Sequence, residues 1–129
     1  MEPDILVVDD SAAIRKILQR VLRQTGMAIN AIYEAGDGEE ALGLMQGHKV
    51  DLVLSDINMP KMDGLQLLAA LKSSPDWARI PVVMITTEGG EGTVSEAVKL
   101  GAAGYVRKPF TADQIKEKLA GILELALPL

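Results

Sequence analysis

The sequence predicts an α/β fold, a doubly wound parallel sheet of five strands with helices on both faces. Short aliphatic runs alternate along the chain with segments of helical periodicity, and this alternation requires right-handed crossovers between parallel strands. Hydrophobic residues make up 48% of the chain but aromatic residues only 3%, which suits strands buried on both faces in an aliphatic core. We therefore expect a three-layer sandwich of helices, sheet and helices.

Five short segments have the length and composition of buried strands. The first is an uninterrupted aliphatic run that stops at Asp9 and Asp10. The fourth is opened by Pro81, and proline is tolerated at the first residue of a strand. The expected strands are residues 5–8, 29–34, 50–55, 82–85 and 105–107, of which the second has the weakest pattern.

The segments that follow these strands have the apolar spacing of amphipathic helices. Ser11 is the expected cap of the first helix and Gly26 its stop. Thr111 and Gln114 have capping-box spacing at the start of the last helix. The apolar faces are marked by Ile14, Ile17, Leu18, Val21 and Leu22; by Ala41, Leu42 and Met45; by Leu65, Leu68 and Leu71; by Val94, Ala97 and Val98; and by Ile115, Leu119 and Ile122.

Length and composition narrow the class of protein. We expect residues 1–129 to form a single domain, because this length suits one compact core. The net charge of −5 provides no basic surface for direct binding of nucleic acid or anionic lipid, and the absence of cysteine excludes disulfides and thiolate zinc sites. Because there is no signal-peptide pattern and no apolar stretch long enough to span a bilayer, we expect a cytoplasmic protein.

Polar residues stand where four of the predicted strands end. They are Asp9, Asp10, Asp56, Thr86 and Lys108. In open parallel sheets, ligands bind outside this edge. Three carboxylates that meet there would repel one another unless a cation neutralises them, and Mg²⁺ prefers such oxygen ligands. An aspartate in this setting can accept a phosphoryl group, with an ammonium group and a hydroxyl available to stabilise its oxygens.

Each of these residues has a simpler explanation when it is considered alone. An aspartate after a strand is often a helix cap or a turn residue, and a single lysine or threonine in a loop is usually solvated surface. Their occurrence together at the ends of four strands favours a shared site. The glycine-rich residues 89–92 lack the lysine and hydroxyl of a phosphate-binding P-loop and indicate a connector instead.

Residues 56–64, with the sequence Asp-Ile-Asn-Met-Pro-Lys-Met-Asp-Gly, resemble the receiver domain of two-component response regulators. The matching pieces elsewhere are residues 7–11, the pair Thr86 and Thr87, and residues 104–110. The resemblance extends over essentially the whole chain and is greatest to the stand-alone chemotaxis (CheY-like) type. It implies a flavodoxin-like sheet with the strand order 2-1-3-4-5.

The resemblance also implies a role for each residue of the site. Asp56 corresponds to the phosphoacceptor. Mg²⁺ would be bound by the carboxylates of Asp10 and Asp56, by the backbone carbonyl of Asn58, and through water by Asp9. Lys108 would contact a phosphoryl oxygen, and family members usually have a cis peptide bond after the lysine at this position.

The resemblance assigns a second group of residues to switching and to the lifetime of the phosphoryl group. Thr86 corresponds to the hydroxyl that moves toward the phosphoryl group, and Tyr105 to the aromatic residue that then turns inward. The face formed by the fourth helix, fifth strand and fifth helix would change shape. Asn58 and Glu88 stand where polar residues help to orient the water that hydrolyses the aspartyl phosphate.

We therefore expect a signalling switch that supports its own phosphorylation and dephosphorylation and is not an enzyme in the ordinary sense. It would receive its phosphoryl group from a sensor histidine kinase, bind a downstream protein partner, and be a monomer when unphosphorylated. Two alternatives stay open. One is a receiver cut from a larger regulator with an output domain; the other is an Mg²⁺-dependent phosphohydrolase, although Asn58 stands where haloacid-dehalogenase-like enzymes have their general acid.

Overall fold

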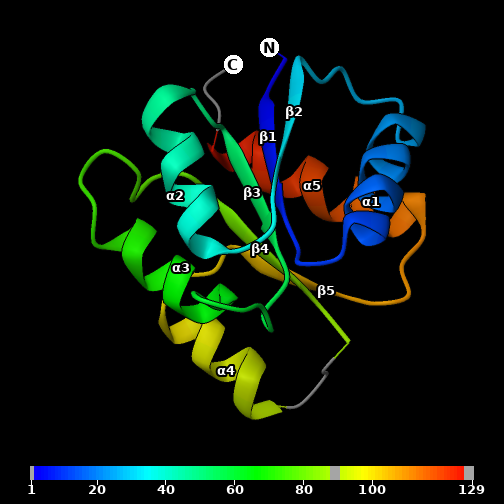
Figure 1. The fold of residues 1–129 in the computed structure, drawn as a ribbon. Coiled ribbons are helices and arrows are strands. Elements are labelled where there is room, and N and C mark those ends of the chain that lie inside the picture. Colours follow the sequence, from blue (N-terminus) through cyan, green and yellow to red (C-terminus); the bar gives the residue numbers. More distant parts are fainter. Residues whose placement is uncertain (1, 88–90, 127–129) are drawn as a thin grey trace.

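The computed structural model describes residues 2–87 and 91–126, which form a five-stranded sheet between two layers of helices (Figure 1). The strands are β1 (Asp4–Val8), β2 (Ala31–Ala35), β3 (Leu52–Ser55), β4 (Val82–Thr86) and β5 (Gly104–Arg107). The helices are α1 (Ala12–Gln24), α2 (Gly38–Gly47), α3 (Gly64–Lys72), α4 (Glu91–Lys99) and α5 (Ala112–Ala126). All strand pairs are parallel and their order is β2-β1-β3-β4-β5, which confirms the predicted sheet.

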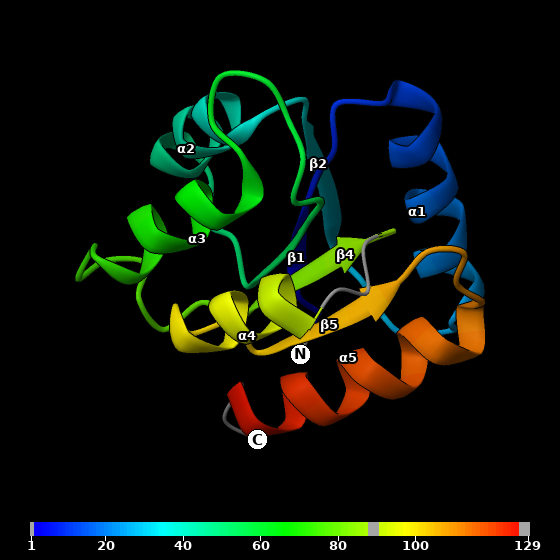
Figure 2. The same cartoon turned by 90° about the horizontal axis from the view of Figure 1, so that it is seen from below.

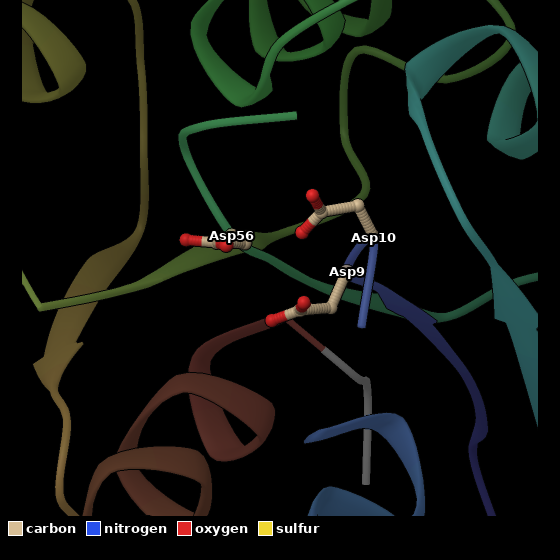
Figure 3. A group of neighbouring side chains, drawn as sticks. All are labelled: Asp9, Asp10 and Asp56. Carbon is tan, nitrogen blue, oxygen red and sulfur yellow. The ribbon is translucent and has the colours of Figure 1, made fainter. Parts of the chain in front are cut away.

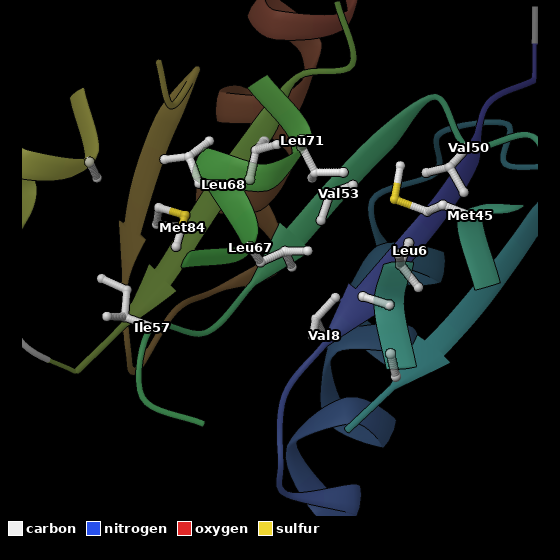
Figure 4. Packing of buried hydrophobic residues seen from close by; sticks show 14 residues of the cluster. Leu6, Val8, Met45, Val50, Val53, Ile57, Leu67, Leu68, Leu71 and Met84 are labelled. Carbon is white, nitrogen blue, oxygen red and sulfur yellow. The ribbon is translucent and has the colours of Figure 1, made fainter. Parts of the chain in front are cut away.

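Helices cover both faces of the sheet. The two views place α2, α3 and α4 on one face and α1 and α5 on the other (Figures 1 and 2). Successive side chains of β1 alternate between the two cores: Leu6 and Val8 pack on the side of α2 and α3, and Ile5 and Val7 on the side of α1 and α5. Figure 4 shows the first of these cores, in which leucines of α3 pack against the sheet. Burial of each such side chain contributes about 1.5–3 kcal/mol to the free energy of folding. Apolar packing therefore stabilises the sheet, and polar residues can occupy the ends of its strands.

Two strands begin two residues later than predicted. β2 starts at Ala31, which pairs with Asp4 at the beginning of β1. β3 starts at Leu52. The preceding residue, Asp51, still contacts β1: its N–H donates to the Asp4 carbonyl at 2.8 Å, and its side chain accepts a hydrogen bond from the Asp4 N–H at 2.8 Å. Val50 is buried but lies outside the strand. The aliphatic character of Val50 therefore reports burial rather than membership of the sheet.

The predicted helix caps are present. The Ser11 hydroxyl accepts a hydrogen bond from the Ile14 N–H at 3.3 Å at the start of α1. Thr111 and Gln114 form both bonds of a capping box before α5, with lengths of 2.9 and 3.2 Å. Gly26 follows α1 with a φ of +77°, which L-residues rarely adopt. None of the helices in the described ranges combines the length and the apolarity needed to cross a membrane.

The loop between β3 and α3 returns very close to the end of β3. The Gly64 N–H donates a hydrogen bond to the Ile57 carbonyl at 2.7 Å. A Cβ atom at Gly64 would overlap the carbonyl oxygen of Asp56 and would lie 2.8 Å from the Ile57 Cα. Because both obstacles are backbone atoms, they cannot turn aside as a side chain can. Glycine at position 64 is thus a requirement of the backbone path around Asp56.

Replacing this glycine tests that requirement. Gly64→Ala should lower the free energy of unfolding by about 1–3 kcal/mol or more, because inserting atoms into a packed site usually costs this much. Gly43→Ala is the matched control, because Gly43 lies within α2 and an added Cβ would meet nothing within 4 Å. That control should raise the free energy of unfolding by about 0.5–1 kcal/mol. Urea titrations followed by circular dichroism measure both, and similar values for the two variants would contradict the close approach at Gly64.

Candidate functional site

Three acidic residues converge at the carboxyl end of the sheet (Figure 3). Asp9 and Asp10 follow β1, and Asp56 follows β3. β1 and β3 are neighbours in the sheet, with Val8 paired to Ser55, so the parallel register brings the residues after them together. One carboxylate oxygen from each aspartate lies within 4.8 Å of the others. The convergence expected from the sequence is therefore present in the structure.

Lys108 brings a positive charge to this cluster from β5. Its Nζ lies 2.9 Å from Asp9 Oδ2 and 3.5 Å from Asp56 Oδ2, and its side chain is only 13% exposed. The backbone N–H of Lys108 donates to the Thr86 carbonyl at 2.9 Å, which ties the end of β5 to the end of β4. The peptide bond between Lys108 and Pro109 is cis, as the resemblance implied.

Asp9 and Asp56 differ in how their carboxylates are held. Asp9 is 2% exposed, and its Oδ1 accepts the Ser11 N–H at 2.9 Å while its Oδ2 faces Lys108. Asp56 is more accessible; its Oδ1 accepts the Ile57 N–H at 2.8 Å. Burial raises the pKa of Asp56 from its ordinary value. The Ile57 N–H and Lys108 oppose this shift, and the negative charge of Asp9 adds to it.

The donor set fits a divalent cation of the Mg²⁺ type. The cluster offers carboxylate oxygens, it keeps a net negative charge beside a single ammonium group, and Asp10 is exposed to solvent. Hard cations with several bound waters suit such a site. Asp9, Asp10 and Asp56 are thus the residues that could hold the ion. Asn58 is exposed, two residues after Asp56 in the loop that Gly64 closes.

The two residues expected to act in switching lie on adjacent strands. Thr86 ends β4 and is 1% exposed. Tyr105 lies on β5 and is 40% exposed, with the Lys118 Nζ of α5 5.9 Å from the centre of its ring. Tyr105 and Lys118 line a surface groove of about 730 Å³ between β5 and α5. The tyrosine is therefore turned outward in this structure. Glu88 lies outside the described residues.

Two residues that shape the site have roles that the sequence pattern does not reveal. The contact of Gly64 with the backbone of Asp56 depends on the path of the folded loop. The Nη1 of Arg15 donates to the Asp9 carbonyl at 2.6 Å. The available signal for Arg15 was its place one turn into the helix that follows the two aspartates. That signal does not specify which backbone group the side chain reaches.

Comparison with known proteins is consistent with this arrangement. Residues 5–120 match the family model described as the response regulator receiver domain. The chain is 40% identical over 120 residues to the chemotaxis protein CheY of Pseudomonas aeruginosa, with 93% of this chain and 95% of that protein covered.

Solved structures give the same result. The chain resembles one chain in the crystal structure of the CheX–CheY–BeF3–Mg2+ complex from Borrelia burgdorferi, with a TM-score of 0.84 and 31% identity, covering 93% of this chain and 88% of that one. It also resembles the signal receiver domain of an HD domain-containing protein from Pseudomonas fluorescens, with a TM-score of 0.88, 28% identity and 98% of each chain covered. The likeness therefore includes the fold and nearly the full length of these proteins.

The raised pKa of Asp56 predicts a stability gain for Asp56→Asn at pH 7 in the presence of a chelator. An ionised Asp56 is less stable in the folded site than in the unfolded chain. The penalty begins as the pH rises through the unfolded value, about 3.9, and is complete above the higher folded pKa. The gain should therefore shrink as the pH falls back through this interval. Urea unfolding of the wild-type protein and of Asp56→Asn at several pH values measures this gain. A loss of stability in Asp56→Asn at pH 7 would contradict the raised pKa of Asp56.

Proposed function

The chain belongs to the response regulator receiver domain family, and we propose that it is a Mg²⁺-dependent phosphoacceptor switch of the chemotaxis type, phosphorylated on Asp56. The observation that supports this most strongly is the position of the Asp56 carboxylate, beside two further aspartates and 3.5 Å from the Lys108 ammonium group. The family consists of signalling switches rather than ordinary enzymes. Asn58 also stands where haloacid-dehalogenase-like phosphohydrolases have their general acid, which does not favour that alternative.

The donor in this proposal is the phosphohistidine of a sensor histidine kinase. The Ile57 N–H holds Oδ1 of Asp56 and so orients the carboxylate, which leaves Oδ2 as the attacking atom. A new O–P bond forms while the P–N bond of the phosphohistidine breaks, and the histidine nitrogen leaves with the bonding electrons and takes up a proton. Positioning and charge supply most of the catalysis in such a transfer.

The charge of the transferring group has to be offset by the residues around it. Asp10 and Asp56 would hold Mg²⁺ through their carboxylates, Asn58 through its backbone carbonyl, and Asp9 through water. The ion, when bound, neutralises the negative charge that develops on the phosphoryl oxygens. Lys108 is already held between Asp9 and Asp56, so its ammonium group can donate to a phosphoryl oxygen without entering from solvent.

Switching follows from the new charge at residue 56. A phosphoryl group adds roughly −1.5 to −2 charges and three acceptor oxygens. The Thr86 hydroxyl would move toward it and leave space into which Tyr105 can turn from its outward position. The face of α4, β5 and α5 would then change shape where the groove beside Tyr105 and Lys118 lies, and a protein partner would be bound or released. Phosphorylation acts by favouring one of two existing states.

The remaining parts of the proposal depend on the sequence and the relatives. Asn58 and Glu88 tune the hydrolysis of the aspartyl phosphate, and the unphosphorylated protein is a cytoplasmic monomer. One resembled structure is the receiver domain of an HD domain-containing protein. The same domain can therefore occur within a larger regulator, and this alternative applies to the present chain as well.

Phosphorylation can be tested directly by mass. Incubation with acetyl phosphate and Mg²⁺ should add one phosphoryl group, and the adduct should be lost in Asp56→Asn and in the presence of a chelator. Asp76→Asn is the control, because Asp76 is an exposed aspartate that lines a separate groove with Trp77 and Ile80; it should keep the adduct. An undiminished adduct on Asp56→Asn would contradict the proposal.

The role of Glu88 in hydrolysis is tested by following the same assay over time. The adduct should be lost more slowly in Glu88→Ala than in the wild-type protein, and an equal rate of loss would remove Glu88 from the proposal.

The coupling of Thr86 to Tyr105 has its own test. Beryllium fluoride, a phosphoryl mimic, should shift the ring resonances of Tyr105 in the wild-type protein. In Thr86→Ala the shift should be mostly lost although the mimic still binds, whereas Thr86→Ser, which keeps the hydroxyl, should retain most of it. NMR with ¹³C-labelled tyrosine measures the effect. A full shift in Thr86→Ala would show that Tyr105 moves independently of this hydroxyl.

A further inference from the structure

Arg15 connects to the chain on both sides of Asp10. Its backbone N–H donates to the Ser11 carbonyl at 3.0 Å, the first hydrogen bond of α1. Its guanidinium group reaches back, and Nη1 donates to the Asp9 carbonyl at 2.6 Å. One residue of the helix therefore holds the carbonyl groups of the two residues that flank Asp10, which are Asp9 and Ser11.

Asp10 depends on this support more than the other two aspartates do. The carboxylate of Asp9 is held by Ser11 and Lys108, and that of Asp56 by the Ile57 N–H. Within the described residues, no hydrogen bond or ion pair holds the carboxylate of Asp10. The placement of this carboxylate therefore relies on the direction in which its side chain leaves the backbone. Because the peptide unit is planar, fixing the Asp9 carbonyl also fixes the direction in which the chain enters Asp10.

The guanidinium group is itself fixed by a second partner. Arg15 Nε donates to Glu34 Oε1 on β2 at 3.0 Å, and the Arg15 side chain is only 19% exposed. The planar guanidinium presents donors on two sides, so one group can bind a carboxylate and a backbone carbonyl together. A lysine ammonium group lacks this fork and this reach. The pair of Arg15 and Glu34 therefore anchors the loop after β1 to the edge strand of the sheet.

We propose that Arg15 is a positioning residue, which sets the carboxylate of Asp10 for a divalent cation by holding the peptide unit between Asp9 and Asp10. This inference rests on the proposed function, in which Asp10 binds Mg²⁺. Arg15 does not touch the ion or the phosphoryl group. Its effect passes through the backbone of the two aspartates.

Arg15 could instead act only as a positive charge, and this simpler role predicts the opposite effect of its removal on metal binding. If Arg15 acted only as a positive charge near the cluster, removing it would strengthen the attraction of a cation. If Arg15 holds the Asp9 carbonyl, removing it loosens a ligand and weakens the binding of the cation. Arg15→Lys separates the two further, because it keeps the charge and loses the planar fork.

The experiment is a calorimetric titration of the full chain with Mg²⁺ in the absence of any phosphodonor. Arg15→Met and Arg15→Lys should each weaken Mg²⁺ binding by about tenfold, the lower end of the effect of residues that orient metal ligands. Glu34→Gln should weaken it less, because the bond from Arg15 to the Asp9 carbonyl remains. Arg20→Met is the matched control: Arg20 is an exposed cation of the same helix, and its loss should change the affinity by no more than about twofold.

A second measurement keeps the test independent of overall stability. Amide hydrogen exchange of Asp10 and Ser11 in the metal-free protein should be faster in Arg15→Met, while the free energy of unfolding shows that the variant is folded. Tighter Mg²⁺ binding by Arg15→Met, or wild-type affinity in Arg15→Lys, would overturn the inference and leave the proposed function intact. Absence of Mg²⁺ binding by the wild-type protein would instead overturn the proposed function, and this inference with it.

Discussion

The ammonium group of Lys108 pairs with two of the three carboxylates that share one end of the sheet. Asp9, Asp10 and Asp56 are brought together by the pairing of β1 with β3, which is itself held by apolar burial. Their mutual repulsion is offset by Lys108, whose Nζ lies 2.9 Å from one carboxylate and 3.5 Å from another. One lysine cannot balance three acids, so the cluster retains the negative charge that attracts a cation. The clustering of the carboxylates thus lowers the stability of the fold, and it also gives the site its negative charge.

Lys108 also connects the acidic cluster to the exposed surface of β5. Lys108 follows β5 directly, its N–H is bonded to the Thr86 carbonyl, and Tyr105 lies on the same strand with its ring exposed beside α5. In the proposed switch, a displacement of Lys108 or Thr86 toward a group on Asp56 would act at the ends of β5, the edge strand of the sheet, and of β4, its buried neighbour. Tyr105 and the groove beside it lie on that edge strand.

Much of the fold and site could be predicted because both depend on local patterns. The alternation of short apolar segments with helical ones identified all five strands, although the second has a weak pattern. The rule that parallel strands end together placed Asp9, Asp56 and Lys108 at one site. The beginnings of β2 and β3 could not be predicted, since they depend on which residues Asp4 contacts across the sheet. Gly64 and Arg15 were missed for the same reason: their importance comes from backbone carbonyls of distant or folded-back segments. Sequence spacing reveals which side chains gather, but not which backbone groups they hold.

The proposed role of Asp56 as phosphoacceptor is tested most directly by a crystal structure of this chain grown with Mg²⁺ and beryllium fluoride. We expect fluoroberyllate bonded to the Asp56 carboxylate, a metal ion against Asp10 and Asp56, and the Lys108 Nζ within hydrogen-bond distance of a fluorine. A metal ion and fluoroberyllate bound elsewhere, with Lys108 still paired to Asp9 and Asp56 as in the free protein, would contradict it.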